Sequence, residues 1–109
     1  MSWAIEFTDR AKRDLRDILD YVTFELREPQ IAVNLVRTIT GEILSLDNMP
    51  MRYPIYDEEP WMAKGLRYFP VKKYLVFYYP DEARNTVYIA RVMYGGRNIS
   101  SQLGESETI

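Results

Sequence analysis

Two stretches in the second half of the chain decide its fold: GLRYFPVKKYLVFYY (65–79) and VYIARVMYGGR (87–97). Both are rich in β-branched and aromatic residues, which are typical of strands. We expect strands over residues 64–71, 74–79 and 86–94. The connections at 72–73 and 80–85 are too short for a crossover helix, so consecutive strands must pair antiparallel. The sequence therefore predicts a three-stranded antiparallel meander.

Basic residues are concentrated in the same region. Residues 61–98 contain seven basic and two acidic residues, a net charge of +5, whereas the rest of the chain contains seven basic and fourteen acidic residues, a net charge of −7. The net charge of −2 for the whole chain hides this asymmetry. We expect the sheet to present its positive charge to an anionic partner.

The chain has 109 residues, no cysteine and no histidine. This length fits one domain over residues 1–109, with a core over about 3–98 and a polar tail over 99–109 that has little to bury. Without cysteine there is no disulfide or thiolate chemistry, and without histidine the commonest general base and metal ligand is missing. We expect no metal and no cofactor.

The N-terminal residues lack the basic flank and long apolar run of a signal peptide. No stretch approaches the roughly 20 apolar residues that span a membrane. We therefore expect a soluble, cytoplasmic protein.

The first half of the chain predicts one strand and two helices. Residues 3–7 alternate in polarity as a short strand does, and Thr8 is a suitable helix N-cap. Apolar residues then recur three and four apart in two sets separated by Pro29, and these are Ala11, Leu15, Ile18, Val22 and Leu26, then Ala32, Leu35, Val36, Ile39, Ile43 and Leu46. The junction between the two helices is short, so they must run antiparallel.

Together these elements predict an α+β fold: a short N-terminal strand, an antiparallel helical hairpin and a three-stranded antiparallel meander. Residues 51–63 have no clear periodicity and are expected to form an ordered loop. The helices should pack on one face of the sheet and leave the other face available for binding.

Six residues of the meander are candidate binding residues: Arg67, Lys72, Lys73, Arg91, Tyr94 and Arg97. A charge inside an apolar strand normally faces solvent or is paired, and for Arg91 we also weigh a salt bridge to a helix carboxylate such as Glu42 or Asp47. Tyr94 either stacks on a base or packs across the sheet. The pair Gly95-Gly96 either allows close approach to a ligand or forms a simple turn.

The segments LRYFPVKKYLVFYY (66–79) and VYIARVMYGGRN (87–98), preceded by a strand and a helical hairpin, resemble the RelE/ParE family of type II toxin–antitoxin toxins. The resemblance covers about residues 3–98 and is closer to the ParE-like branch. It implies a toxin that inhibits growth by binding DNA gyrase, without chemistry of its own. It also implies a cognate antitoxin that lays a helix or strand across the toxin, with a homodimer or a toxin–antitoxin heterotetramer as possible assemblies.

The RelE-like branch of the same family implies a different activity, metal-independent cleavage of mRNA on the ribosome. In that branch cations stabilise charge and transfer protons, and the six candidates above would carry these roles. Arg97 matches the arginine that follows the last strand there. Leu75, however, stands where that branch has a catalytic arginine, and the region around Leu103 lacks its tyrosine. A third alternative is a binding module that keeps the fold without activity.

Overall fold

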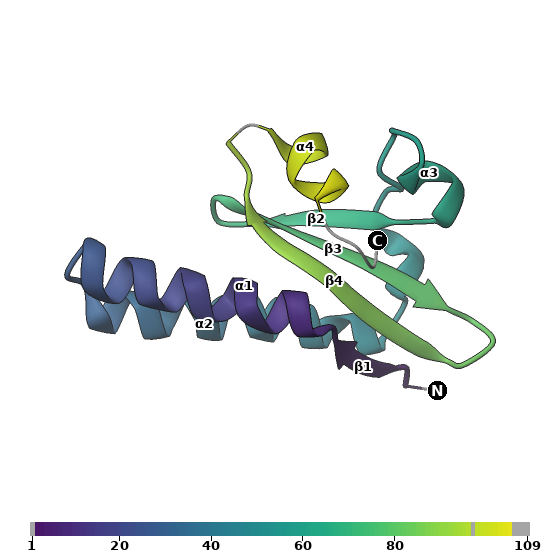
Figure 1. Ribbon diagram of the computed structural model, residues 1–109. Helices are drawn as coiled ribbons and strands as arrows, with labels where there is room; N and C mark the ends of the chain where they lie inside the picture. Colours follow the sequence, from purple (N-terminus) through teal and green to yellow (C-terminus); the bar gives the residue numbers. More distant parts are fainter. Residues whose placement is uncertain (1, 97, 106–109) are drawn as a thin grey trace.

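A helical hairpin packs against one face of a four-stranded sheet in the computed structural model, which describes residues 2–96 and 98–105 (Figure 1). The elements, in chain order, are β1 (Ala4–Phe7), α1 (Asp9–Asp20), α2 (Pro29–Leu44), α3 (Trp61–Lys64), β2 (Arg67–Val71), β3 (Tyr74–Asp81), β4 (Thr86–Tyr94) and α4 (Ile99–Gly104). A π-helical turn, η1 (Tyr21–Glu25), extends α1, and two 3-10 turns, η2 (Ser45–Asp47) and η3 (Pro50–Arg52), follow α2.

The strand order is β1-β4-β3-β2. The β2–β3 and β3–β4 pairs are antiparallel, which confirms the predicted meander. The first strand lies beside the last one and runs parallel to it, from Ala4 opposite Thr86 to Phe7 opposite Ile89. The sheet is therefore mixed, because the hairpin between β1 and the meander carries the chain back to the edge of β4.

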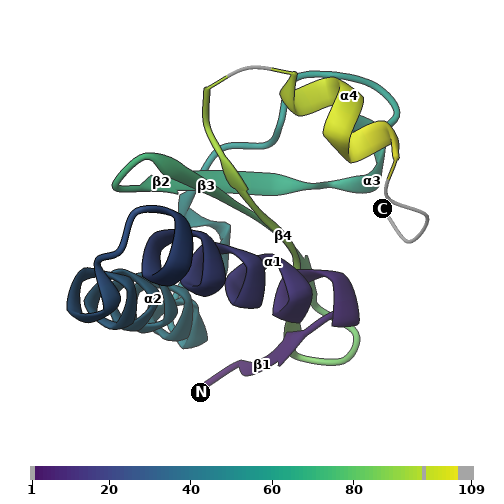
Figure 2. The ribbon, with the colours of Figure 1, turned by 60° about the vertical axis from the view of Figure 1, so that its left-hand side comes forward.

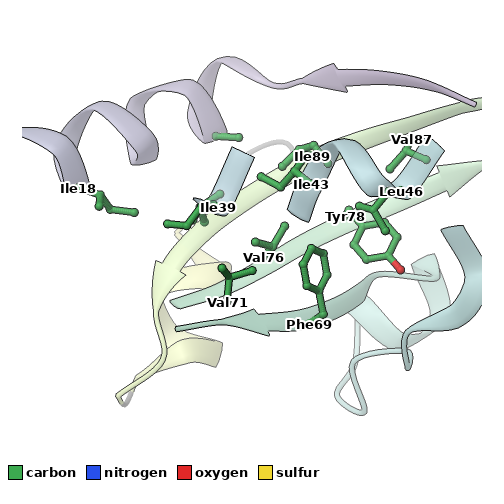
Figure 3. Packing of buried hydrophobic residues seen from close by; sticks show 12 residues of the cluster. Ile18, Ile39, Ile43, Leu46, Phe69, Val71, Val76, Tyr78, Val87 and Ile89 are labelled. Carbon is green, nitrogen blue, oxygen red and sulfur yellow. The ribbon is translucent and has the colours of Figure 1, made fainter. Parts of the chain in front are cut away.

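The main core lies between the hairpin and the sheet (Figure 3). Ile39, Ile43 and Leu46 contribute fully buried side chains from α2 and η2, and they face Val76 and Tyr78 of β3. Burying an aliphatic side chain of this size stabilises the fold by roughly 1.5–3 kcal/mol. The apolar residues that recur at helical spacing in the sequence are thus the ones that α2 packs against the sheet.

The opposite face of the sheet is also covered, by α3 and α4 (Figures 1 and 2). Trp61 of α3 and Leu103 of α4 pack there with Phe77 and Met93 of the sheet, and Leu103 is completely buried. Two expectations are therefore wrong: this face is not left free, and residues 99–104 are not a tail with little to bury. The apolar residues Ile99 and Leu103, four apart on α4, supply the contact that the polar composition conceals.

A β-bulge in β4 changes which side chains face the helices. Phe77 pairs with Arg91 and Tyr78 pairs with Ile89, so Ala90 is an extra residue in β4. A bulge switches the alternation of side chains beyond it. As a result Val92 joins Ile89 in the main core, whereas Met93 joins the cluster on the other face.

The hairpin extends beyond the end of the sheet (Figure 1). At its tip the chain reverses through Arg27, which has a φ of 55°. Several apolar side chains near this tip are exposed. These are Tyr21, Phe24, Leu26 and Ile31, each more than half exposed.

Candidate functional site

A groove of about 1010 Å³ opens where the hairpin leaves the end of the sheet. Its lining comes from α1, η1 and α2 on one side, and from the β2–β3 turn, the end of β4 and α4 on the other. The apolar part of the lining consists mainly of Ile18, Val22, Leu26, Ile31 and Leu35. Leu26 is 52% exposed and Ile31 is 55% exposed. An apolar groove beside two helices is the kind of surface that receives an amphipathic helix or an extended segment.

Two lysines stand at the edge of this groove. Lys72 and Lys73 form the turn between β2 and β3, and Lys72 takes a left-handed conformation with a φ of 55°. Both side chains are exposed, and no described residue forms an ion pair or hydrogen bond with either ammonium group. The turn therefore adds two unneutralised positive charges to an apolar groove.

Aromatic side chains lie next to these lysines. The rings of Tyr74 and Tyr94 meet edge to face, with centroids 5.9 Å apart, and Tyr21 lines the same groove. Burial raises the pKa of Tyr74, and the neighbouring Tyr21 and Tyr94 raise it further. The Tyr74 hydroxyl is therefore protonated at neutral pH and can donate a hydrogen bond to an occupant of the groove.

The double glycine after β4 holds Tyr94 in place. The Gly95 N–H donates to the Lys73 carbonyl at 2.8 Å, which closes the end of β4 onto the β2–β3 turn. A Cβ atom at Gly96 would lie 2.6 Å from Cε2 of the Tyr94 ring. The close approach that Gly96 allows is thus to the protein's own tyrosine, whereas a Cβ atom at Gly95 would meet Leu75 and the Lys73 carbonyl.

Arg91 lies at one end of the groove, but its side chain is buried. Its Nε donates to Asp14 Oδ2 at 2.7 Å and its Nη2 donates to Asp14 Oδ1 at 3.1 Å. Its Nη1 also donates to the Gln102 carbonyl of α4 at 3.2 Å. A helix carboxylate does pair with Arg91, as one alternative predicted. That carboxylate is Asp14 of α1 rather than Glu42 or Asp47.

Asp14 also binds the backbone of β4 just beyond the bulge. Its Oδ2 accepts the Val92 N–H at 2.9 Å, and Arg10 Nε approaches its Oδ1 at 3.6 Å. The residue is only 6% exposed. A buried carboxylate with this set of donors links α1 to β4.

The remaining candidates lie away from the groove or outside the described residues. Arg67 is not part of the groove lining, and its Nη1 donates to the carbonyls of Tyr53 and Met51 at 2.6 and 3.1 Å. Arg97 lies outside the described residues. The structure therefore brings together Lys72, Lys73 and Tyr94, with the buried Arg91 beside them, and separates Arg67 from this group.

The meander does not present its positive charge on one face. Arg91 is neutralised by Asp14, and Arg84 lies 3.9 Å from Asp81 at the β3–β4 turn, the opposite end of β3 from the lysines. Among the described residues of the meander, Lys72 and Lys73 are therefore the exposed cations that line the groove. The groove also contains Tyr21, Leu26 and Ile31, which are not among the six candidate residues. In the sequence, these residues could have been found because apolar residues continue as far as the hairpin tip, where their side chains stay exposed.

The described residues contain no group of three or more His, Cys, Asp or Glu residues that could hold a metal ion. Within the same described ranges, no helix is long and apolar enough to cross a membrane.

The sequence matches the family of ParE toxins of type II toxin–antitoxin systems (parDE) over residues 5–99. The chain belongs to this family, so it is a ParE/RelE-type toxin of a type II toxin–antitoxin system. No curated protein matches the sequence significantly.

Three solved structures share the fold. One is described as a chromosomal ParDE system from P. aeruginosa, with 18% identity, a TM-score of 0.71, and 87% of this chain and 98% of that one covered. The RelBE2 toxin–antitoxin complex from Mycobacterium tuberculosis has 24% identity and a TM-score of 0.59, covering 86% and 99%. A mutant of the E. coli toxin RelE in the free state has 13% identity and a TM-score of 0.66, covering 97% and 95%. At these identities the likeness shows the fold, which both branches of the family share.

Proposed function

We propose that the groove is the binding site for the cognate antitoxin of this toxin. The observation that carries this proposal is the exposed apolar wall formed by Leu26 and Ile31, facing the two unneutralised charges of Lys72 and Lys73. An amphipathic antitoxin segment with acidic residues beside its apolar face fits this surface. Covering the wall removes apolar area from water, which stabilises the complex.

Leu26→Asp and Ile31→Asp test this site. Both side chains are already more than half exposed, so the free toxin should fold normally. The antitoxin complex should weaken by about 30-fold or more, because each change places an unpaired charge in an apolar contact. Isothermal titration calorimetry with the antitoxin encoded beside the toxin measures the loss.

Val33→Asp is the matched control, since Val33 is an exposed apolar residue of α2 outside the groove lining. Its antitoxin affinity should equal that of the unaltered toxin. Unchanged affinity in both groove variants would exclude the groove as the antitoxin site.

We further propose that the toxin inhibits growth by binding DNA gyrase, without chemistry of its own. Two observations support binding over cleavage. Arg91 is engaged by Asp14 and Arg67 by backbone carbonyls, so two of the five candidate cations are used within the fold. Leu75 also places an apolar side chain where the RelE-like resemblance implies an arginine.

The competing activity is ribosome-dependent cleavage of mRNA, with catalysis by Lys72, Lys73, Tyr94 and Arg97. Two assays with purified toxin separate the possibilities: gyrase supercoiling, and primer extension on mRNA from translating ribosomes. Inhibited supercoiling with intact mRNA is the expected result. Codon-linked cleavage with normal supercoiling would exclude the gyrase proposal, and growth unaffected by induced toxin would point to an inactive binding module.

A further inference from the structure

The segment that runs from the last residue of α2 to just before α3, residues 44–59, is held in one conformation by two arginines. Arg52 lies over the Tyr53 ring at 4.8 Å, and its Nη1 donates to the Asn48 carbonyl at 2.6 Å. Its Nη2 donates to Ser45 Oγ at 2.8 Å. Arg52 thus fixes the first part of the segment through contacts within the segment itself.

The second part is fixed from the sheet. Arg67 Nη1 donates to the carbonyls of Met51 and Tyr53, and the Tyr78 hydroxyl donates to the Pro50 carbonyl at 2.6 Å. Ile55 forms an isolated bridge with Arg67 at the edge of β2. A loop with this many backbone contacts is rigid before any partner arrives, which lowers the entropic cost of binding.

This rigid loop exposes apolar side chains. Leu44 is 51% exposed, Met49 is 69%, Met51 is 37% and Ile55 is 40%. Met49 also has a φ of 53°, a conformation unfavourable for a residue with a Cβ atom. The fold thus holds a methionine outward in a strained conformation, and exposed apolar groups of this kind mark protein–protein contact sites.

The loop and its flanking residues carry a net negative charge, although Arg67 of β2 also contacts the loop. Five acids lie in this part of the chain, and they are Glu42, Asp47, Asp57, Glu58 and Glu59, all exposed. The only basic residue between 42 and 59 is Arg52, so the net charge of the segment is −4. Such a surface repels nucleic acid and attracts a protein surface that carries lysines and arginines.

No residue of 44–59 lines the groove. The loop is therefore a second surface, whose occupant need not compete for the residues that we assign to the antitoxin.

We propose that loop 44–59 is the contact surface for the toxin's target, and that this target is a protein with an apolar patch surrounded by basic residues. The inference rests on the proposed function, because it assigns a surface to the action of the toxin. The methionines and Ile55 supply the apolar contact, and the acidic residues select a basic partner.

The double variant Met49→Lys with Met51→Lys tests the proposal. It removes the apolar contact and places two positive charges against a basic partner, while both side chains start from the surface. Growth arrest on induction should need at least about tenfold more toxin, in line with the loss of a central apolar contact. Antitoxin affinity, measured by calorimetry, should remain within about twofold of the unaltered value because the groove is untouched.

The control is Phe24→Lys with Val33→Lys, the same change of charge at two exposed apolar residues of the hairpin that do not line the groove. It should arrest growth normally. Undiminished growth arrest by the methionine variant would overturn this inference but not the proposed toxin action. Loss of antitoxin binding by the same variant would also overturn it. So would increased toxicity, since that result indicates an anionic target. If the unaltered toxin does not arrest growth, the proposed toxin action fails and this inference fails with it.

Discussion

Asp14 joins two elements at a single carboxylate. It accepts hydrogen bonds from Arg91 Nε and from the Val92 N–H, and the arginine is only 3% exposed. Removing the negative charge leaves a buried guanidinium without a counter-charge. Asp14→Asn should therefore lower the free energy of unfolding by about 3–5 kcal/mol, measured by urea denaturation.

Asp17→Asn on the same helix is the control. Asp17 is exposed, so its replacement should change the free energy of unfolding by less than about 0.5 kcal/mol. A loss below about 1 kcal/mol in Asp14→Asn would show that water replaces the missing contacts.

Tyr78 makes the stability of the fold depend on pH in the alkaline range. Burial raises the pKa of Tyr78 from 10.0 to about 12, although nearby Arg67 and Arg52 oppose the shift. Its hydroxyl donates to the Pro50 carbonyl, so only the protonated form keeps this bond. The stabilisation contributed by the protonated Tyr78 hydroxyl is complete below pH 10 and is lost as the pH rises through about 12.

Comparing the toxin with Tyr78→Phe isolates this contribution. The phenylalanine variant should be less stable at pH 8, and the difference between the two proteins should shrink between pH 10 and 12. Urea denaturation at fixed pH values, followed by circular dichroism, measures both curves. A difference that stays constant over this range would contradict the assignment.

At the residue scale, the sequence leaves open whether Arg91 binds a target or pairs with a helix carboxylate, and it does not indicate Asp14 as the partner. The partner depends on the bulge at Ala90, because the extra residue sets the direction of the following side chains, and β1 ends opposite Ile89, which leaves the Val92 N–H open to Asp14. A bulge leaves no periodic signal in one sequence.

At the element scale, the last helix is part of the fold. Leu103 is completely buried against Phe77 and Met93, and the Ser100 hydroxyl donates to Glu58 at 2.7 Å. Leu103→Ala should lower the free energy of unfolding by about 2–5 kcal/mol, from lost burial and the cavity that remains.

Leu44→Ala makes the same chemical change at a leucine that is 51% exposed. Its cost should stay below about 1 kcal/mol. Equal costs at both positions in urea denaturation would mean that α4 does not pack as described.

The elements differ in how far their own sequence determines them. The strands and the two long helices are predicted well, since each has enough residues to show a period of two or of 3.6. The helices α3 and α4 have four and six residues, too few to show a period. Their positions depend on the sheet residues against which Trp61 and Leu103 pack, and these contacts are seen only in the tertiary structure.

At the scale of the whole molecule, opposite charges lie on separate surfaces. Lys72 and Lys73 stand at the groove, whereas the segment 42–59 has a net charge of −4. Antitoxin binding at the groove should therefore weaken as salt is raised, because salt screens exposed charges beyond about 10 Å at 0.1 M.

Replacing both lysines by alanine should reduce this salt dependence as well as the affinity. Calorimetry at low and high ionic strength gives the slope for each protein. Leu26→Ala is the control, which should lose affinity but keep the original slope. An unchanged slope in the lysine variant would show that its charges do not contact the antitoxin.

The parallel pairing of β1 with β4 determines when the sheet can form during synthesis of the chain. The Thr8 hydroxyl donates to the Ile89 carbonyl across 81 residues of chain, and β1 has no other strand beside it. Because synthesis starts at the N-terminus, the first strand emerges from the ribosome long before its partner. The four-stranded sheet can form only after β4 has been synthesised, so until then β1 has no partner strand in the growing chain.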